Sequence, residues 1–315
     1  MKKVTLVFPG QGSQYVGMGK NFTNDAEVGH LFHDANSALG YDLKSMMLEG
    51  PESDLKLTQN TQPAIVTHSI LLLQKLKSIL AQKNITVERV LGHSVGEYSA
   101  LVAAGSLTFQ DAVKAVHFRG KYMQEAAPVG IGTMYAILKQ PEDIIREACA
   151  LSSSEMDQVS PANFNEPNQI VISGDKVACE RAIKWMEEKT GGRVKAIELQ
   201  VSAPFHCALM KPAEIKLKTV LDNIKFQDLT IPYVANIDAF EYAVATSEKT
   251  LRENLLKQVC GSVLWTQSIG KLASSTVVIE VGPGKVLAGL IKKINPEIKV
   301  ISLDTETAMT ELESL

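Results

Sequence analysis

The chain has only four cysteines among its 315 residues, and none forms a CxxC pair or a cysteine–histidine spacing typical of metal ligands. This argues against a zinc centre and a disulfide framework. The chain also lacks an excess of positive charge, since it has 32 basic and 35 acidic residues and a net charge of −3. Its composition therefore gives no indication of nucleic-acid binding, for which a basic domain is expected. No apolar run approaches the roughly 18 residues of a membrane-spanning helix, and the N-terminal residues lack the apolar stretch of a secretory signal. We therefore expect a cytoplasmic protein without a membrane partner.

The composition that is present is that of a globular protein. Apolar types make up 45% of the chain and charged types 21%, which argues against disorder. At about 150 residues per domain, the length allows one large or two moderate domains.

Short apolar runs alternate with helical patterns along most of the chain. The runs predict strands at 4–8, 90–91, 277–281 and 300–303, and the helical patterns predict helices at 62–80 and 109–127. Strands separated by helices indicate an α/β fold with a mainly parallel sheet and helices on both faces.

One stretch breaks this rhythm. Between 130 and 200 the pattern reads strand, helix, strand, helix, strand, at 133–138, 142–151, 169–173, 176–189 and 193–199. We interpret residues 130–200 as a small inserted α+β domain that opens at the hinge-like 128–132. Residues 1–129 and 201–315 then form a large α/β domain.

The sharpest chemical signal is a G-x-S-x-G motif at 92–96, which follows a short strand and precedes a helical run. The glycines permit a tight turn that holds the hydroxyl of Ser94 out into a pocket. The backbone N–H of Val95, at the helix N-terminus, can then stabilise an oxyanion. An ordinary glycine-rich turn is the alternative interpretation, since the motif also occurs by chance.

A serine nucleophile needs a base, and six histidines are available. His93 adjoins the serine and points elsewhere, while His68 and His117 lie in helical stretches where packing roles are common. His206 lies in a loop after a strand, where α/β proteins place functional groups. It is therefore the favoured candidate.

Two weaker signals remain open on residue chemistry alone. The loop 8–14, FPGQGSQ, lacks the third glycine of a dinucleotide fingerprint because Tyr15 stands there. It is suited to donate backbone N–H groups to an oxyanion, or it is a plain glycine-rich turn. Arg119, followed by Gly120 within a helical run, is either a solvated surface residue or an inward guanidinium that binds a carboxylate.

Taken together, the motifs resemble the malonyl-CoA:acyl carrier protein transacylase family, and the resemblance runs from Phe8 to about Leu290. It rests on seven segments in order: FPGQGSQ at 8–14, TQPA at 61–64, GHSVGEYSA at 92–100, RGKYMQ at 119–124, NFN at 163–165, APFHCALM at 203–210 and EVGPGKVL at 280–287.

The resemblance implies a ping-pong acyltransferase. Ser94 attacks the thioester of malonyl-CoA while His206 takes its proton, and the N–H groups of Gln11 and Val95 hold the oxyanion. The backbone carbonyl of Gln258 orients the histidine in place of an aspartate. The acyl group then passes to the phosphopantetheine thiol of acyl carrier protein.

The resemblance also implies substrate contacts. Arg119 pairs with the malonyl carboxylate, Gln62 lines the pocket, and Asn163 and Asn165 lie in a nearby loop. Phe205, where many free-standing relatives have serine, crowds the α-carbon of the acyl group and disfavours a methyl branch.

The implied fold is a hydrolase-like parallel sheet domain with an inserted small ferredoxin-like domain. We expect no cofactor beyond the CoA thioester substrate, and a monomer. Because the carrier protein is acidic, a basic rim of Lys195, Arg193 and Lys121 is expected to meet it.

Phe205 also keeps open a transferase that serves a polyketide synthase in trans. An editing thioester hydrolase of the same family is a further alternative, although such enzymes tend to lack the arginine. A non-catalytic carrier-protein docking module is the third, and the full motif context of Ser94 and His206 argues against it.

Overall fold

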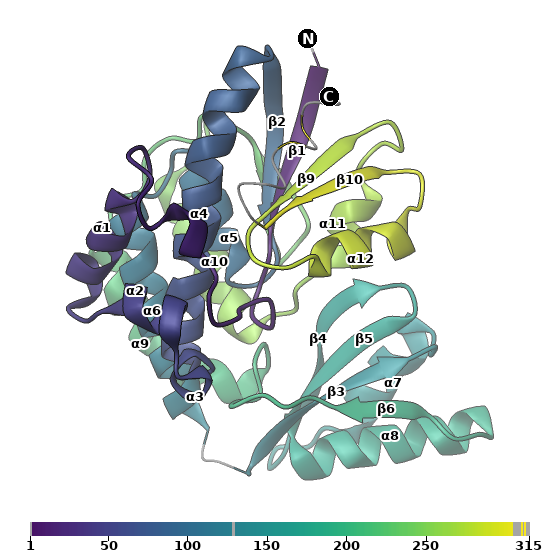
Figure 1. Ribbon diagram of the computed structural model, residues 1–315. Helices are drawn as coiled ribbons and strands as arrows, with labels where there is room; N and C mark the ends of the chain where they lie inside the picture. Colours follow the sequence, from purple (N-terminus) through teal and green to yellow (C-terminus); the bar gives the residue numbers. More distant parts are fainter. Residues whose placement is uncertain (1, 128–129, 305–309, 311, 313–315) are drawn as a thin grey trace.

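The computed structural model describes residues 2–127 and 130–304, together with 310 and 312. Two sheets organise this part of the chain, and the smaller one lies beneath the larger one in Figure 1. Helices flank the larger sheet on both faces, which confirms the predicted α/β class.

The larger sheet has six strands in the order β10-β9-β1-β2-β7-β8. Neighbouring strands pair in parallel except at the edge, where β7 and β8 are antiparallel. The strands are β1 (Lys2–Phe8), β2 (Ile85–Gly92), β7 (Tyr233–Val234), β8 (Glu241–Tyr242), β9 (Val277–Val281) and β10 (Lys299–Leu303).

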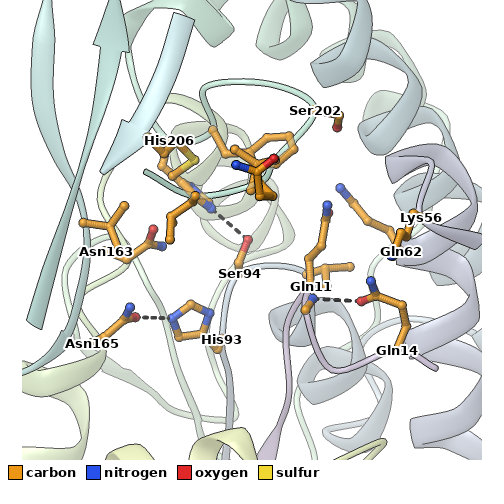
Figure 2. A pocket seen from close by; sticks show the side chains of 18 of the residues that line it. Gln11, Gln14, Lys56, Gln62, His93, Ser94, Asn163, Asn165, Ser202 and His206 are labelled. Carbon is orange, nitrogen blue, oxygen red and sulfur yellow. Dashed lines mark hydrogen bonds between the residues drawn. The ribbon is translucent and has the colours of Figure 1, made fainter. Parts of the chain in front are cut away.

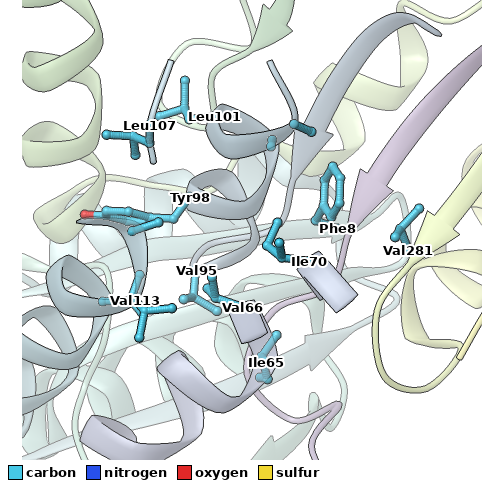
Figure 3. Packing of buried hydrophobic residues seen from close by; sticks show 14 of the residues in the cluster. Phe8, Ile65, Val66, Ile70, Val95, Tyr98, Leu101, Leu107, Val113 and Val281 are labelled. Carbon is cyan, nitrogen blue, oxygen red and sulfur yellow. The ribbon is translucent and has the colours of Figure 1, made fainter. Parts of the chain in front are cut away.

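Alternation along the central strands explains why both faces are covered. Successive side chains point to opposite faces, so Leu6 packs into the core under α4, α5 and α6, while Val7 packs toward α11 and α12. Figure 3 shows the first of these cores, in which Phe8 from β1 belongs to the same buried cluster as Ile70, Val66 and Val95. The central parallel strands are therefore buried on both faces of the sheet.

The described helices comprise α-helices and the short 3-10 helices η1 and η2, and they are given next in chain order. They are η1 (Lys20–Phe22), α1 (His30–Leu39), α2 (Leu43–Glu49), α3 (Glu52–Leu55), α4 (Thr58–Gln82), α5 (Gly96–Ala103), α6 (Phe109–Ala126), α7 (Glu142–Ser152), α8 (Lys176–Thr190), η2 (Ala208–Met210), α9 (Lys211–Asp222), α10 (Glu248–Cys260), α11 (Trp265–Gly270) and α12 (Val286–Ile294).

Helix α4 is longer and more apolar than the predicted helix at 62–80. By length and composition it could cross a membrane, contrary to the expectation that no apolar run approaches such a length. However, 67% of its most apolar window is buried inside the protein, where α6 packs against it. It is the central core helix of the larger unit.

The smaller sheet has the order β4-β5-β3-β6 and is antiparallel throughout. Its strands are β3 (Gly132–Leu138), β4 (Val159–Glu166), β5 (Gln169–Asp175) and β6 (Lys195–Glu198), with α7 and α8 packed on one face. The chain order is βαββαβ, which is the ferredoxin-like arrangement.

The predicted βαβαβ order of this segment is wrong by one strand, β4. That strand contains Pro161 and pairs irregularly with β5, so its sequence has no regular alternation. Its other edge bonds to the larger unit, since the N–H of Val263 donates to the carbonyl of Ala162 at 2.8 Å. Pro128 and Val129, at the expected domain boundary, lie outside the described residues.

Candidate active site

Ser94 stands on the turn between β2 and α5, and its φ of 51° is in the left-handed region. The glycines on either side are required by close backbone contacts. A Cβ on Gly92 would lie 2.0 Å from the backbone of Gly96, and a Cβ on Gly96 would lie 2.1 Å from the carbonyl oxygen of Phe8. The G-x-S-x-G pattern thus encodes a strained turn that presents the hydroxyl.

We expect Gly96→Ala to destabilise the protein by about 3 kcal/mol or more, because the clashing atoms belong to the backbone of Phe8 and Pro9 and cannot move aside. Gly289→Ala is the matched control. Gly289 lies in α12 with no atom within 4 Å of its Cβ position, so alanine there should stabilise by about 0.4–1 kcal/mol. Chemical unfolding of both variants measures the contrast, and equal effects would contradict this account of the turn.

The predicted base lies beside the predicted nucleophile. His206 Nε2 is 2.8 Å from Ser94 Oγ, and His206 Nδ1 is 2.8 Å from the backbone carbonyl oxygen of Gln258 (Figure 2 shows the first contact). Because a carbonyl only accepts, Nδ1 carries the proton and Nε2 is free to accept from the serine. Burial, with a contribution from the charge of Arg119, lowers the pKa of His206 to about 3, so the imidazole is neutral at pH 7.

Arg119 is buried beside the same hydroxyl. Its Nη1 donates to Gln62 Oε1 at 2.9 Å, and its Nη2 donates to Gln258 Oε1 at 2.8 Å and to Ser94 Oγ at 3.1 Å. Only 2% of the residue is exposed, and no carboxylate among the described residues forms an ion pair with it. Burial lowers the pKa of the guanidinium, which nevertheless stays charged because arginine is not deprotonated in proteins. The site therefore holds a buried cation, without a direct ion pair, next to the Ser94 hydroxyl.

The residue after Arg119 explains how the guanidinium reaches this position. A Cβ on Gly120 would lie 2.5 Å from the carbonyl oxygen of Thr58, so glycine lets α6 approach the first turn of α4. Pro63 inside α4 lacks an N–H, and the freed carbonyl of Gln59 accepts instead from His117 of α6, at 3.0 Å from Nδ1. The TQPA and RG motifs thus encode the contact between these helices. This brings Arg119 to Gln62.

A cavity of about 300 Å³ opens over the serine between the two sheets. Its lining includes the apolar side chains of Met134, Val171, Leu199 and Phe205 together with polar side chains from both the larger and the smaller unit. The remaining predicted site residues also line it: Gln11, Val95, Asn163 and Asn165. Among the described residues, no cluster of histidine, cysteine or acidic side chains could hold a metal ion.

The contacts of the predicted loop residues differ from one another. Asn165 Oδ1 is 2.9 Å from His93 Nε2, so it contacts the neighbour of the nucleophile and not the nucleophile itself (Figure 2). Gln11 contacts α4 through Nε2, 3.3 Å from Thr58 Oγ1. Both contacts join loops of different elements around the cavity.

Two residues of this site were not predicted from the sequence. The N–H of Ser94 donates to Asn236 Oδ1 at 2.7 Å, and Asn236 Nδ2 donates to the carbonyl of Gly92 at 2.6 Å. Glu97 is fully buried behind the turn and accepts from Gln258 Nε2 at 2.6 Å. Asn236 follows shortly after β7, so a polar residue at the carboxyl edge of the sheet was the signal available for it.

Comparisons with known proteins show the family of the chain. Residues 5–301 match the acyl transferase domain family. The malonyl CoA-acyl carrier protein transacylase of Bacillus subtilis (strain 168) is 43% identical over 319 residues, covering 100% of this chain and 98% of that protein.

Solved structures are similar over the whole chain as well. The malonyl CoA-acyl carrier protein transacylase from Coxiella burnetii has a TM-score of 0.91 at 37% identity, covering 100% of this chain and 98% of that one. A malonyl-transacylase solved in complex with a type II PKS acyl-carrier protein has a TM-score of 0.89 at 38% identity, with 100% of both chains covered. The chain belongs to the malonyl-CoA:acyl carrier protein transacylase family, the [acyl-carrier-protein] S-malonyltransferases.

Proposed function

We propose that the chain moves a malonyl group from CoA to acyl carrier protein through an ester on Ser94. The observation that carries this proposal is the double contact of Ser94 Oγ, which meets both the neutral base His206 and the unpaired guanidinium of Arg119. One contact supplies a proton acceptor, and the other supplies a partner for an acyl group that bears a carboxylate.

In the first half-reaction, Ser94 Oγ forms a bond to the thioester carbonyl carbon as His206 Nε2 takes its proton. The N–H groups of Gln11 and Val95 stabilise the resulting oxyanion, since both residues line the cavity beside the serine. When the intermediate collapses, the carbon–sulfur bond breaks and His206 returns the proton to the CoA sulfur.

The second half-reaction reverses these roles. His206 takes the proton of the phosphopantetheine thiol, whose sulfur attacks the malonyl ester, and Ser94 leaves with the proton that His206 gives back. The carbonyl of Gln258 holds the imidazole tautomer through both halves. Arg119 and Gln62 bind the malonyl carboxylate, while Asn163, Asn165 and the buried ring of Phe205 bound the acyl pocket.

Intact-protein mass spectrometry tests this sequence of steps. Mixing with malonyl-CoA should add one malonyl group at Ser94 with loss of CoA, and addition of holo-carrier protein should remove it and produce malonyl-carrier protein. Loss of the adduct to water at the same rate with or without carrier protein would instead indicate an editing hydrolase.

We assign the activity to fatty acid biosynthesis in the cytoplasm, with a monomeric enzyme. A polyketide carrier protein is the second candidate acceptor, because the relative in complex with a type II PKS carrier protein covers the whole chain. Phe205 in the pocket is compatible with both. Transfer rates to purified carrier proteins of the two pathways discriminate between them.

Three exposed cations are proposed to meet the acidic carrier protein: Lys121, Arg193 and Lys195. Lys195 lies in β6, which leads directly into residues 199–202 of the cavity wall, and Lys121 follows Arg119 by two residues in α6. Charge reversal of all three should slow the second half-reaction about 10-fold at low salt and leave CoA-dependent acylation unchanged. The control is Lys249→Glu in α10, outside the cavity lining. An unchanged second half-reaction would remove the three as contacts.

A further inference from the structure

Gln258 has a side chain that lies between two buried charges. Its Nε2 donates to Glu97 Oε2 at 2.6 Å, and its Oε1 accepts from Arg119 Nη2 at 2.8 Å. Glu97 and Gln258 are both fully buried, and Glu97 makes no ion pair with the guanidinium itself. The amide therefore connects the carboxylate to the guanidinium without bringing the two charges into contact.

The orientation of this amide follows from what its neighbours can do. The guanidinium of Arg119 can only donate, and an ionised Glu97 can only accept. If the amide of Gln258 were turned over, donor would face donor and acceptor would face acceptor. Glu97, as the charged acceptor of Nε2, thus helps to fix which end of Gln258 is presented to Arg119.

The other contacts of Glu97 tie this arrangement to the nucleophile turn. Glu97 lies in the first turn of α5, three residues after Ser94, and its Oε2 also accepts from the N–H of Asn236 at 3.3 Å. Gln258 Nε2 further contacts the carbonyl of Ser94 at 2.9 Å. Burial raises the pKa of Glu97 to about 7, with the hydrogen bond from Gln258 acting in the opposite direction, so the side chain is ionised at pH 8.

We propose that Glu97 is a positioning residue which, through the side-chain amide of Gln258, holds Arg119 in place to receive the malonyl carboxylate. The side chain of Gln258 separates the carboxylate of Glu97 from the guanidinium of Arg119. Glu97 can therefore order the guanidinium without forming an ion pair with it, and the positive charge of Arg119 remains available to the substrate. A direct Glu97–Arg119 ion pair would instead compete with the malonyl group. This proposal rests on the role given to Arg119 in the proposed function.

The test is a double-mutant cycle at pH 8 that measures acylation of the enzyme by malonyl-CoA and by acetyl-CoA. Glu97→Gln keeps the shape but removes the charge, so Gln258 Nε2 is left with neutral acceptors only and the amide is held less firmly against Arg119. We expect kcat/KM for malonyl-CoA to fall about 10-fold and that for acetyl-CoA to change less than about 2-fold, a coupling typical of residues in one network. In the Arg119→Ala background, E97Q should change neither value.

Glu280→Gln is the matched control for loss of a buried carboxylate. Glu280 is also fully buried, but it accepts from the backbone N–H groups of Leu287 and Ala288 and has no contact with the site. Any effect of E280Q should be equal for the two acyl groups. If E97Q does not fold, Glu97→Asp replaces it, because the shorter side chain keeps a carboxylate and withdraws it from Gln258 Nε2; the same selective loss is expected.

The outcomes separate the two proposals. Equal losses for both acyl groups in E97Q, or a further loss when E97Q is added to R119A, would overturn the positioning role. If R119A itself fails to discriminate malonyl from acetyl, the assignment of Arg119 under the proposed function is wrong. If R119A discriminates and E97Q does not, only the role of Glu97 is wrong.

Discussion

Ser94→Ala is expected to abolish the malonyl adduct and to reduce transfer to carrier protein by about 10³-fold or more. The reason is that Ser94 Oγ is the atom to which His206 Nε2, at 2.8 Å, and Arg119 Nη2, at 3.1 Å, are both directed. Alanine removes the nucleophile and leaves the base without a proton to accept. Intact mass after incubation with malonyl-CoA, followed by a transfer assay, measures the loss.

The control for this change is another serine of the same helix region. Ser99 lies in α5, is fully buried, and its hydroxyl has no hydrogen-bond partner among the described residues. Ser99→Ala should retain both the adduct and transfer. A malonyl adduct that persists in S94A would show that a different residue is the nucleophile, and the ping-pong mechanism would then need another acyl carrier.

The turn that presents Ser94 was predictable because its cause is local. Close contacts of Gly92 with Gly96, and of Gly96 with the end of β1, leave no room for a Cβ at either position. The spacing of the two glycines is therefore sufficient to predict the turn. Strand β9 was predicted at its observed bounds, Val277–Val281, for a similar reason: a β-branched run followed by glycine is sufficient. Local rules of this kind also gave the long helices α4 and α6.

Other parts of the site depend on contacts between residues far apart in the sequence, and no local sequence pattern predicts these contacts. Asn236 contacts Ser94 across 142 positions, and Gln258 contacts Glu97 across 161. The edge strand β4 exists because β5 and the residues around Val263 pair with it, while its own sequence contains Pro161. The carbonyl of Gln258 has no side-chain signature, so only the family resemblance indicated it.

Arg119 illustrates the same limit most clearly. Its residue type fits either a solvated surface or a carboxylate partner, and periodicity within α6 does not decide between them. What decides is the approach of α6 to α4 at Gly120, which buries the guanidinium beside Gln62 and Ser94. This burial without a direct ion pair is the reason we propose Arg119 as the partner of the malonyl carboxylate.

Arg119→Ala is accordingly expected to remove malonyl selectivity. Truncating one partner of a buried charge pair costs roughly 2–5 kcal/mol, so kcat/KM for malonyl-CoA should fall by about 30-fold to several thousand-fold. Acetyl-CoA has no carboxylate and should lose only the contribution of the 3.1 Å contact to Ser94 Oγ, a few-fold at most. Steady-state acylation kinetics with the two thioesters measure the ratio, and an equal loss for both would contradict the assigned role.

The same variant has a second, independent consequence at His206. The charge of Arg119 is the second cause, after burial, that lowers the pKa of this histidine to about 3, below the ordinary value of 6.5. The neutral, proton-accepting form therefore persists as pH falls, and acylation by the unaltered protein should keep its base down to well below pH 6. Without the guanidinium the pKa of His206 must rise, so the acidic limb of acetyl-CoA acylation should move to higher pH in R119A.

Arg119→Lys keeps a positive charge without the planar fork, so it should leave the acidic limb near its original position while still losing malonyl affinity. An acidic limb that stays in place in R119A would mean that burial alone sets the basicity of His206.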